Sequence, residues 1–520
     1  MKLIAQFCLT LLLFFSLISL RASDLDTIGV TLLNQVDPTL QGTGISVAQP
    51  EAVETMGSND FEVNPQIVGQ PMTLFTWISA SGTASTFTNS VGSESIHANT
   101  VGFLFYGSSL GGVAPGVSHV DNYDADYFIT DFIQNDVPFR AQVVNQSFTE
   151  GTNDPVTDQE FDDYTANNGV LFLSGVATIG GVPICSPASC YNGIAVDVTT
   201  PSGTLVSGPT TDGRSKPDIT APGSGATSFS TPYVSGAAAM LLQAAVRGDG
   251  GPNTNAAKNI RTLKALLLNG AIKPLGWTNS VTTPMDLRFG AGILNVFNSW
   301  EQLKGGKTPF IESTSLTNGS PHPPGANASN EPVLRGWDFN SLTNSDTSHD
   351  RVNHYYFNLT GSNPFTLTST LVWLRQAGNT GINNLNLFLY NTANSNLVLC
   401  STSAVDNVQH IYLPSLPPGR YDLQVEKNPN GEVSANETYA LAFEFFNLSL
   451  TITQVDTNAV ISWPLVPTGF QLQSTTNLSP PIVWTAVATP PAVDTNASQN
   501  VVTVPLNGGN QFFRLQRPSS

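Results

Sequence analysis

Three short segments of the chain carry residue types that together could perform nucleophilic catalysis. Ser228 lies in GATSFSTPYVSGAAA, just before a run of small residues that follows Pro232. His97 lies in SIHANTVG, ahead of an apolar segment, and Glu51 follows the buried-type run ISVAQP. A serine at the positive end of a helix can attack a carbonyl when a histidine takes its proton and a carboxylate orients that histidine. We therefore predict that these three side chains converge as a triad.

Each of these residues also has a purely structural interpretation. Ser228 could only cap a helix, and His97 could be a polar residue at a helix start. Glu54 and Asp60 lie close to Glu51 in the sequence and could supply the acid in its place. The sequence alone leaves these alternatives open.

The elements that must position these side chains are strands and helices of an α/β unit. The runs ISVA (45–48), AQVVNQS (141–147) and GVLFLSG (169–175) are apolar throughout rather than alternating, which is typical of parallel strands buried on both faces. A helix is expected to begin near 231–232 and to end at Gly248. A second helix, 257–271, has apolar residues on one face.

Composition and hydrophobic pattern change along the chain, and these changes predict five segments. An apolar N-terminal stretch, 1–23, is typical of a signal peptide, although an uncleaved membrane anchor is the alternative. The α/β unit is expected over 24–305 and a Pro/Asn/Ser-rich linker over 306–335. Strand-rich segments at 336–446 and 447–520 predict two all-β sandwiches, the first jelly-roll-like and the second fibronectin- or immunoglobulin-like.

Five motifs in order resemble the blocks of the subtilase family of serine peptidases. SFSTPYVSG and KPDITAPG resemble the family's segments at and before the nucleophile, and HANTVG followed by GVAPG resembles its histidine block. VVNQSF resembles the strand that borders the substrate cleft, and RFGAGILNV resembles the closing segment. The resemblance implies a three-layer subtilisin-like domain in which Ser228 is the nucleophile, His97 the general base and Ser147 a residue lining the substrate cleft.

The sequence departs from the subtilase pattern at two positions. Glu51 stands where the family carries an aspartate, and its extra methylene still allows it to accept the imidazole N–H. Val176 aligns with the asparagine whose amide donates a hydrogen bond to the oxyanion. Loss of that donor in subtilisin costs about 10²–10³ in turnover, so the resemblance predicts a slowed enzyme that Val176→Asn should accelerate.

Composition limits where the protein works and what it binds. Charged residues make up 11% of the 520, the net charge is −18, and Asn, Thr and Ser must cover the surface, which favours a secreted or cell-surface protein. Nucleic acid and anionic membranes would repel such a chain. Cys185 and Cys190 are close enough for a disulfide in an oxidising compartment, which leaves Cys400 as a single buried thiol.

These observations together predict an exported serine endopeptidase that acts on proteins or peptides. No zinc-binding spacing occurs, no cofactor is expected, and structural calcium cannot be read from the sequence. A catalytically weak or inactive binding protein on a subtilase scaffold is the alternative, and a carbohydrate-binding adhesin acting through the sandwiches is a third hypothesis.

Overall fold

The structure is a computed structural model in which the predicted signal peptide and most of the predicted linker lie outside the described residues. The described residues are 24–55, 57–108, 111–177, 184–200, 203–309, 311–312, 333–343, 351–429, 432–506 and 508–516.

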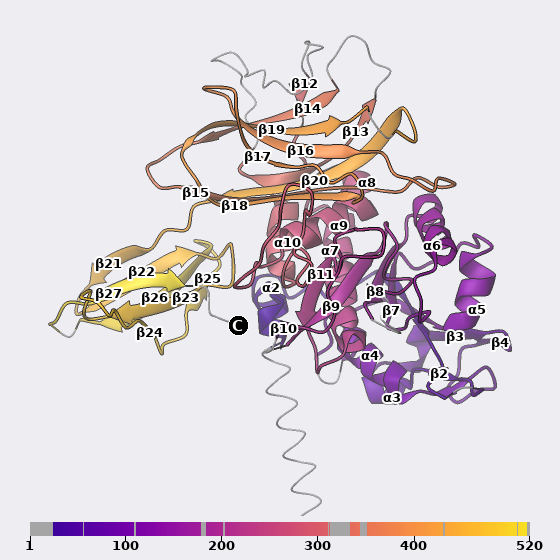
Figure 1. Ribbon diagram of the computed structural model, residues 1–520. Helices are drawn as coiled ribbons and strands as arrows, with labels where there is room; N and C mark the ends of the chain where they lie inside the picture. The colour runs from indigo at the N-terminus through magenta and orange to yellow at the C-terminus, as the bar shows by residue number, and fades with distance from the viewer. Residues whose placement is uncertain are drawn as a thin grey trace, which may run out of the picture.

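A nine-stranded sheet forms the centre of the N-terminal unit (Figure 1), in the order β10-β9-β8-β7-β1-β6-β3-β4 with β11 beside β9. All neighbours are parallel except the edge strands β4 and β10. The prediction of a mostly parallel sheet is therefore confirmed. The strands are β1 (Ser46–Glu51), β3 (Phe75–Ser79), β4 (Gly82–Ala84), β6 (His119–Asp124), β7 (Val143–Gln146), β8 (Leu171–Gly175), β9 (Ile194–Thr200), β10 (Gly203–Thr204) and β11 (Ile219–Pro222).

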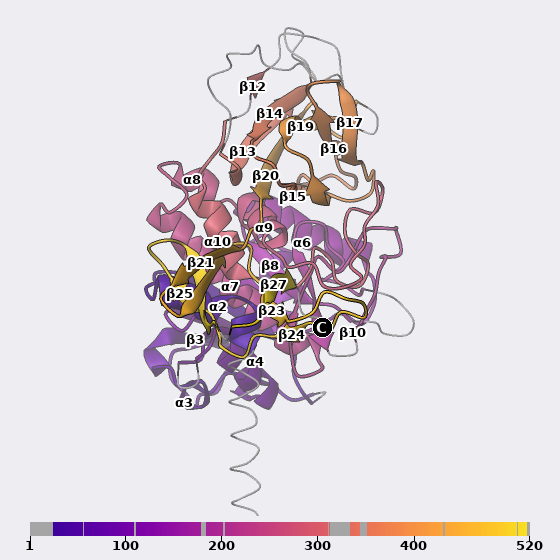
Figure 2. The same ribbon diagram turned by 90° about the vertical axis from the view of Figure 1, so that its left-hand side faces the viewer.

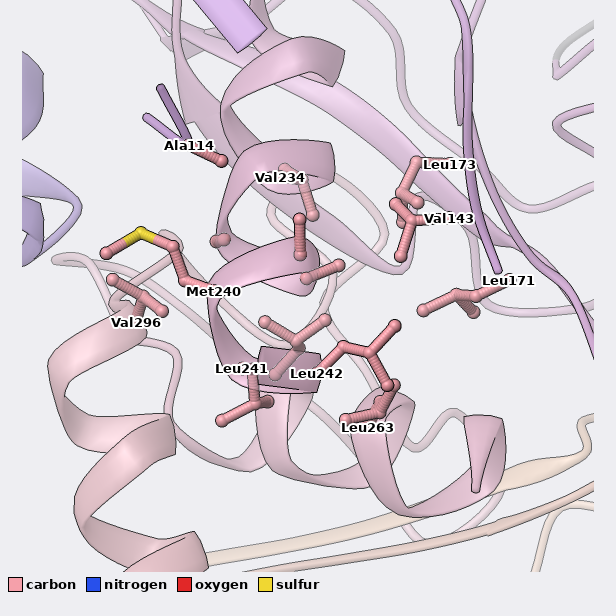
Figure 3. Close-up of a cluster of buried hydrophobic side chains, with 14 of the residues drawn as sticks. Ala114, Val143, Leu171, Leu173, Val234, Met240, Leu241, Leu242, Leu263 and Val296 are labelled. Carbon is pink, nitrogen blue, oxygen red and sulfur yellow. The ribbon is translucent and has the colours of Figure 1, made fainter. Parts of the chain in front are cut away.

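Successive residues of the central strands face opposite layers, which is why the runs are apolar throughout. Val143 and Leu171 belong to the core shared with α4 and α7, whereas Val144 and Phe172 belong to the core on the other face. Figure 3 shows Val143, Leu171 and Leu173 directed toward Val234 and Leu242 of α7. The first layer contains α2 (Val30–Val36), α4 (Ile96–Tyr106), α7 (Thr227–Arg247), α9 (Ile260–Asn269) and α10 (Val296–Lys304), and the other contains α5 (Ala125–Tyr127), η2 (Phe128–Ile133) and α6 (Pro155–Asn168).

Helix α7 begins at Thr227, four to five residues before the predicted start, and ends at Arg247, with the predicted Gly248 as its C-cap. The prediction placed Pro232 in the first turn, but it lies inside the helix. Because proline has no N–H, its presence there leaves one carbonyl of the first turn without its helical partner. That carbonyl belongs to Ser228, and its replacement partner is described below.

Two β-sandwiches follow the α/β unit. The first sandwich packs the sheet β12-β14-β19-β16-β17 on the sheet β13-β20-β15-β18, and the second packs β21-β22-β26-β25 on β24-β23-β27. The strands of the first are β12 (Ile311–Glu312), β13 (Arg335–Thr343), β14 (Val352–Leu359), β15 (Phe365–Trp373), β16 (Leu385–Asn391), β17 (Asn396–Ser401), β18 (Val408–Leu416), β19 (Gly419–Lys427) and β20 (Asn436–Phe446). Those of the second are β21 (Thr451–Val455), β22 (Asn458–Pro464), β23 (Gln471–Thr475), β24 (Thr485–Ala486), β25 (Ala492–Asp494), β26 (Gln499–Pro505) and β27 (Phe512–Gln516).

The first sandwich completes the hydrophobic core of the α/β unit. Helix α9 lies between α7 and the strands β15 and β20 (Figures 1 and 2), and Val372 and Ala440 of those strands join the same cluster as Leu266. Polar contacts reinforce the interface, because Arg375 pairs with the fully buried Asp162 at 2.9 Å. Helix α9 was predicted to bury one face, and the sandwich buries the other as well.

The predicted disulfide between Cys185 and Cys190 is wrong, since neither cysteine is in a disulfide. Hydroxyl groups close the intervening loop instead: Ser186 Oγ lies 3.2 Å from Ser189 Oγ, and Ser189 donates to Asp158 at 2.8 Å. Both cysteines are buried in this packed loop, and burial raises the pKa of Cys190 to about 12. Cys400, predicted to be buried, is only partly so.

No helix among the described residues is long and apolar enough to span a membrane.

Candidate active site

The predicted acid and base meet at the end of β1. Glu51 is the last residue of that strand and is fully buried, and its Oε2 lies 2.7 Å from Nδ1 of His97. His97 is the second residue of α4, and 29% of its side chain is exposed. A buried carboxylate on one imidazole nitrogen leaves Nε2 free to exchange a proton on the open side.

Glu54 contacts the same histidine in a different way. Its Oε1 accepts hydrogen bonds from the backbone N–H of His97 at 2.6 Å and from the Ser95 hydroxyl at 2.5 Å. Ser95 is the N-cap of α4 and accepts from the N–H of Ala98. Glu54 thus fixes the start of the helix, whereas Asp60 binds Ser58 and nearby backbone, so the structure places neither of the alternative acids at the imidazole.

Two carboxylates favour the protonated form of His97. Burial of the ring opposes protonation, but the hydrogen bond that His97 donates to Glu51 and the negative charges of Glu51 and Glu54 outweigh it and raise the pKa of His97 above its usual value. The same contacts lower the pKa of Glu54, against the effect of its burial, through the hydrogen bonds from Ser95 and His97. The site therefore stabilises the imidazolium that would form when the histidine accepts a proton.

Ser228 lies in the first turn of α7, next to the histidine. The ring of Phe229, the following residue, has its centroid 6.0 Å from that of His97. The Ser228 hydroxyl donates to the carbonyl of Ser147 at 3.3 Å, and no hydrogen bond joins it to His97 within the described part of the chain. The structure thus brings acid and base into contact and leaves the serine close by with its hydroxyl directed elsewhere.

Ser147 holds the backbone of Ser228 in place. Its hydroxyl donates to the Ser228 carbonyl at 2.9 Å, the carbonyl that Pro232 leaves without a helical partner. Asn145 donates to the Ser147 hydroxyl at 3.0 Å and accepts from Ser235 of α7 at 2.9 Å. Sequence reasoning missed this role of Asn145, although it lies in the VVNQS motif, because the contact joins a strand to a helix about 90 residues away.

No side chain caps the start of α7. Its N-cap is Ala226, which makes no side-chain cap, whereas α4, α6, α9 and α10 are capped by Ser95, Asp154, Asn259 and Asn295. The first N–H groups of a helix have no partner within it, and they carry partial positive charge. The N–H of Ser228 is therefore suited to bind a developing oxyanion.

The structure does not support the expectation that the Val176 side chain faces the cleft. The residue is 1% exposed and packs with Ile184, Ala188, Ala195 and Val206, and its N–H bonds to Val196 O at 3.0 Å. The preceding Gly175 is the residue that lies against α7, since a Cβ there would be 3.0 Å from the Thr231 hydroxyl. Thr178, a second residue of this loop that could donate a hydrogen bond to the oxyanion, lies outside the described residues.

Comparison with known proteins bears on the same region. The sequence model of the subtilase family matches residues 95–292, a range that includes His97, Ser147 and Ser228 but not Glu51. The comparison with curated proteins finds no match.

Among solved structures, the chain is similar to three peptidase-related proteins. The self-cleaved protease domain of PatA is 24% identical, with 51% of this chain and 99% of that chain covered and a TM-score of 0.35. The PatG macrocyclase in complex with peptide is 17% identical, with coverages of 54% and 98% and a TM-score of 0.38. Tripeptidyl peptidase 2 is 12% identical, with coverages of 74% and 43% and a TM-score of 0.32. By its family match over 95–292, the chain carries a peptidase domain of the subtilase family of serine peptidases.

Proposed function

We propose that the protein is an exported serine endopeptidase in which Ser228, His97 and Glu51 form the catalytic triad. The observation that carries the proposal is the 2.7 Å contact between the buried Glu51 carboxylate and His97, because Glu51 lies outside the family match. Glu51, which was identified from its position at the end of a strand, thus contacts His97, which was identified from its motif. Their contact lies beside the first turn of α7, which carries Ser228, and this supports the same reaction class as the family.

The reaction follows from these positions. The Ser228 hydroxyl rotates from the Ser147 carbonyl toward His97, whose Nε2 takes its proton as Oγ bonds to the peptide carbonyl carbon. Glu51 stabilises the imidazolium, and the Ser228 N–H binds the oxyanion. His97 then gives the proton to the leaving amine as the C–N bond breaks, and water repeats the sequence on the acyl-enzyme.

Two observations favour a slow or inactive relative of this enzyme as the second candidate. The Ser228 hydroxyl contacts Ser147 rather than the histidine, and Val176 supplies no amide to the oxyanion. The same experiment separates the two candidates. The purified protein is treated with a fluorophosphonate probe, and its cleavage of casein is measured in parallel.

We expect wild-type protein to be labelled at Ser228 only and to cleave casein, and Ser228→Ala to lose both. Ser230→Ala is the matched control, because Ser230 is a buried serine of the same turn. Equal labelling of wild type and Ser228→Ala would refute the assignment, and absence of both labelling and cleavage in folded wild-type protein would favour the inactive scaffold.

Export is a separate part of the proposal. It rests on the apolar segment 1–23 and on the low content of charged residues. Mass spectrometry of the N-terminus of protein recovered from the culture medium tests it. An intact residue 1 on cell-associated protein would contradict it.

A further inference from the structure

A buried chain of hydrogen bonds continues behind the acid of the site. Glu51 Oε1, the oxygen that does not face the histidine, accepts from the Gln49 side-chain amide at 2.8 Å. The Gln49 carbonyl oxygen accepts from the Tyr106 hydroxyl at 2.5 Å. All three residues are completely buried, so no water competes with these contacts.

Each polar atom of the Gln49 amide is used. Its nitrogen donates to Glu51 and to the carbonyl of Ala98 at 3.0 Å, and its oxygen accepts from Tyr106. A flipped amide would place its oxygen against two other oxygens and its NH₂ against a hydroxyl. The Tyr106 hydroxyl keeps its proton, because burial and the charge of Glu51 raise its pKa. It can therefore donate to the Gln49 oxygen, while the Glu51 carboxylate and the Ala98 carbonyl, which only accept, fix the orientation of the amide.

The helix that carries His97 is shaped to admit this hydroxyl. Gly102 lies one turn before Tyr106 on α4, and a Cβ at that position would be 2.7 Å from the Tyr106 oxygen and 3.2 Å from the Gln49 oxygen. Even an alanine at 102 would displace the tyrosine or the glutamine. Strand β1 thus supplies the acceptor, Gln49, and α4 supplies both the donor, Tyr106, and the space that Gly102 leaves for it.

We propose that Gln49 and Tyr106 are positioning residues that hold the carboxylate of Glu51 against His97. A glutamate has one more rotatable bond than the aspartate of the family pattern, and that bond lets the carboxylate move away from the ring. The Gln49 amide removes this freedom by holding the second oxygen. This inference rests on the proposed function, because it explains how a glutamate serves as the triad acid.

The kinetic test uses Gln49→Met, which keeps the length of the side chain and removes its amide. A hydrogen bond to a charged group corresponds to about 10- to 100-fold in rate, so kcat should fall by that factor while KM changes less than twofold. Gln409→Met is the matched control: Gln409 is also fully buried and uses its whole amide, but lies in the first sandwich. The Gln409→Met variant should be less stable than the wild-type protein and keep the wild-type kcat.

Double variants separate positioning from a general loss of structure. If Gln49 acts through the acid, Gln49→Met should cost nothing further in a Glu51→Ala background. If Tyr106 acts through Gln49, the loss caused by Tyr106→Phe should disappear in a Gln49→Met background, with Tyr164→Phe as the control for loss of a buried tyrosine hydroxyl bond. Equal losses in both backgrounds would overturn the proposal, as would a wild-type kcat in Gln49→Met. If Gln49→Met does not fold, Tyr106→Phe alone and with Glu51→Ala makes the same test.

A measurement on His97 itself keeps the inference testable in a protein without activity. The charged groups that face the ring are Glu51 and Glu54, while α7 presents the uncharged Ser228 and Phe229. The pKa of His97, measured by site-resolved diethylpyrocarbonate modification against pH, should be lower in Gln49→Met, because a loosened Glu51 stabilises the imidazolium less. An unchanged or higher pKa would overturn the inference. Failure of wild-type Ser228 to label would instead refute the proposed function.

Discussion

Replacing Glu51 by glutamine tests the site most directly, because the two carboxylate oxygens have different partners. Oε1 accepts from Gln49 and Oε2 faces Nδ1 of His97. An amide offers only one acceptor. If its oxygen keeps the bond from Gln49, its NH₂ faces Nδ1 and favours the tautomer with the proton on Nε2, which cannot accept the proton of Ser228. From the cost of the wrong tautomer in a serine protease triad, we expect kcat to fall by about 10⁴-fold.

The stability of the same variant should depend on pH. The pKa of His97 is higher in the folded protein than the usual value near 6.5, so its protonation stabilises the fold fully below about pH 6.5. This contribution disappears as the pH rises through the folded-state pKa. Glu51→Gln removes most of it, and the difference in free energy of unfolding between wild type and variant should therefore be larger at about pH 6 than at about pH 9.

The assay is kcat on a peptide substrate together with urea unfolding at both pH values. Glu62→Gln is the matched control: Glu62 ends the short strand β2 (Asp60–Glu62), is 1% exposed and has a pKa raised by burial. The Glu62→Gln variant should retain the wild-type kcat. The reasoning would be refuted if Glu51→Gln kept more than a tenth of wild-type kcat, or if Glu54→Gln showed the large loss instead.

Three further predictions follow from burial. Val176→Asn should not raise kcat and should lower the free energy of unfolding by about 1–3 kcal/mol, because it puts an amide into an apolar cluster; enzyme kinetics and urea unfolding check this, with a clear gain in kcat as the contrary result. Arg375→Met should destabilise the protein by about 3–5 kcal/mol in urea, since it leaves the buried Asp162 without its cation, and a loss below 1 kcal/mol would contradict the ion pair. Cys185 and Cys190 should both react with iodoacetamide in unreduced, denatured protein; a mass that shows them linked by a disulfide would contradict the reduced state of this loop.

Residues whose signal is local could be predicted from the sequence. Ser228 and His97 lie in the first turns of helices, within recognisable motifs, and Glu51 ends an apolar run, so each position follows from a few neighbours. The parallel sheet is predictable for the same reason, because its strands are apolar on both faces.

Contacts between distant segments could not be predicted in this way. The bond from Tyr106 to Gln49 spans 57 residues and that from Ser147 to the Ser228 carbonyl spans 81. The apolar run before Val176 does not tell whether its side chain points into the cleft or away from it. Its burial depends on residues that only the fold brings near.

Because strands of the first sandwich pack on α9, the helix is synthesised before the residues that bury it. The helix ends at Asn269, but β20, which packs on it, ends at Phe446, about 180 residues further along the chain. At typical translation rates of about 5–20 residues per second, α9 leaves the ribosome on the order of 10–40 s before its cover is complete. During that interval Leu266 and its neighbours lack the apolar partners that β15 and β20 later supply. A nascent chain stalled before β20 should thus expose the apolar surface of α9 around Leu266, to which chaperones can bind, whereas the finished chain buries that surface.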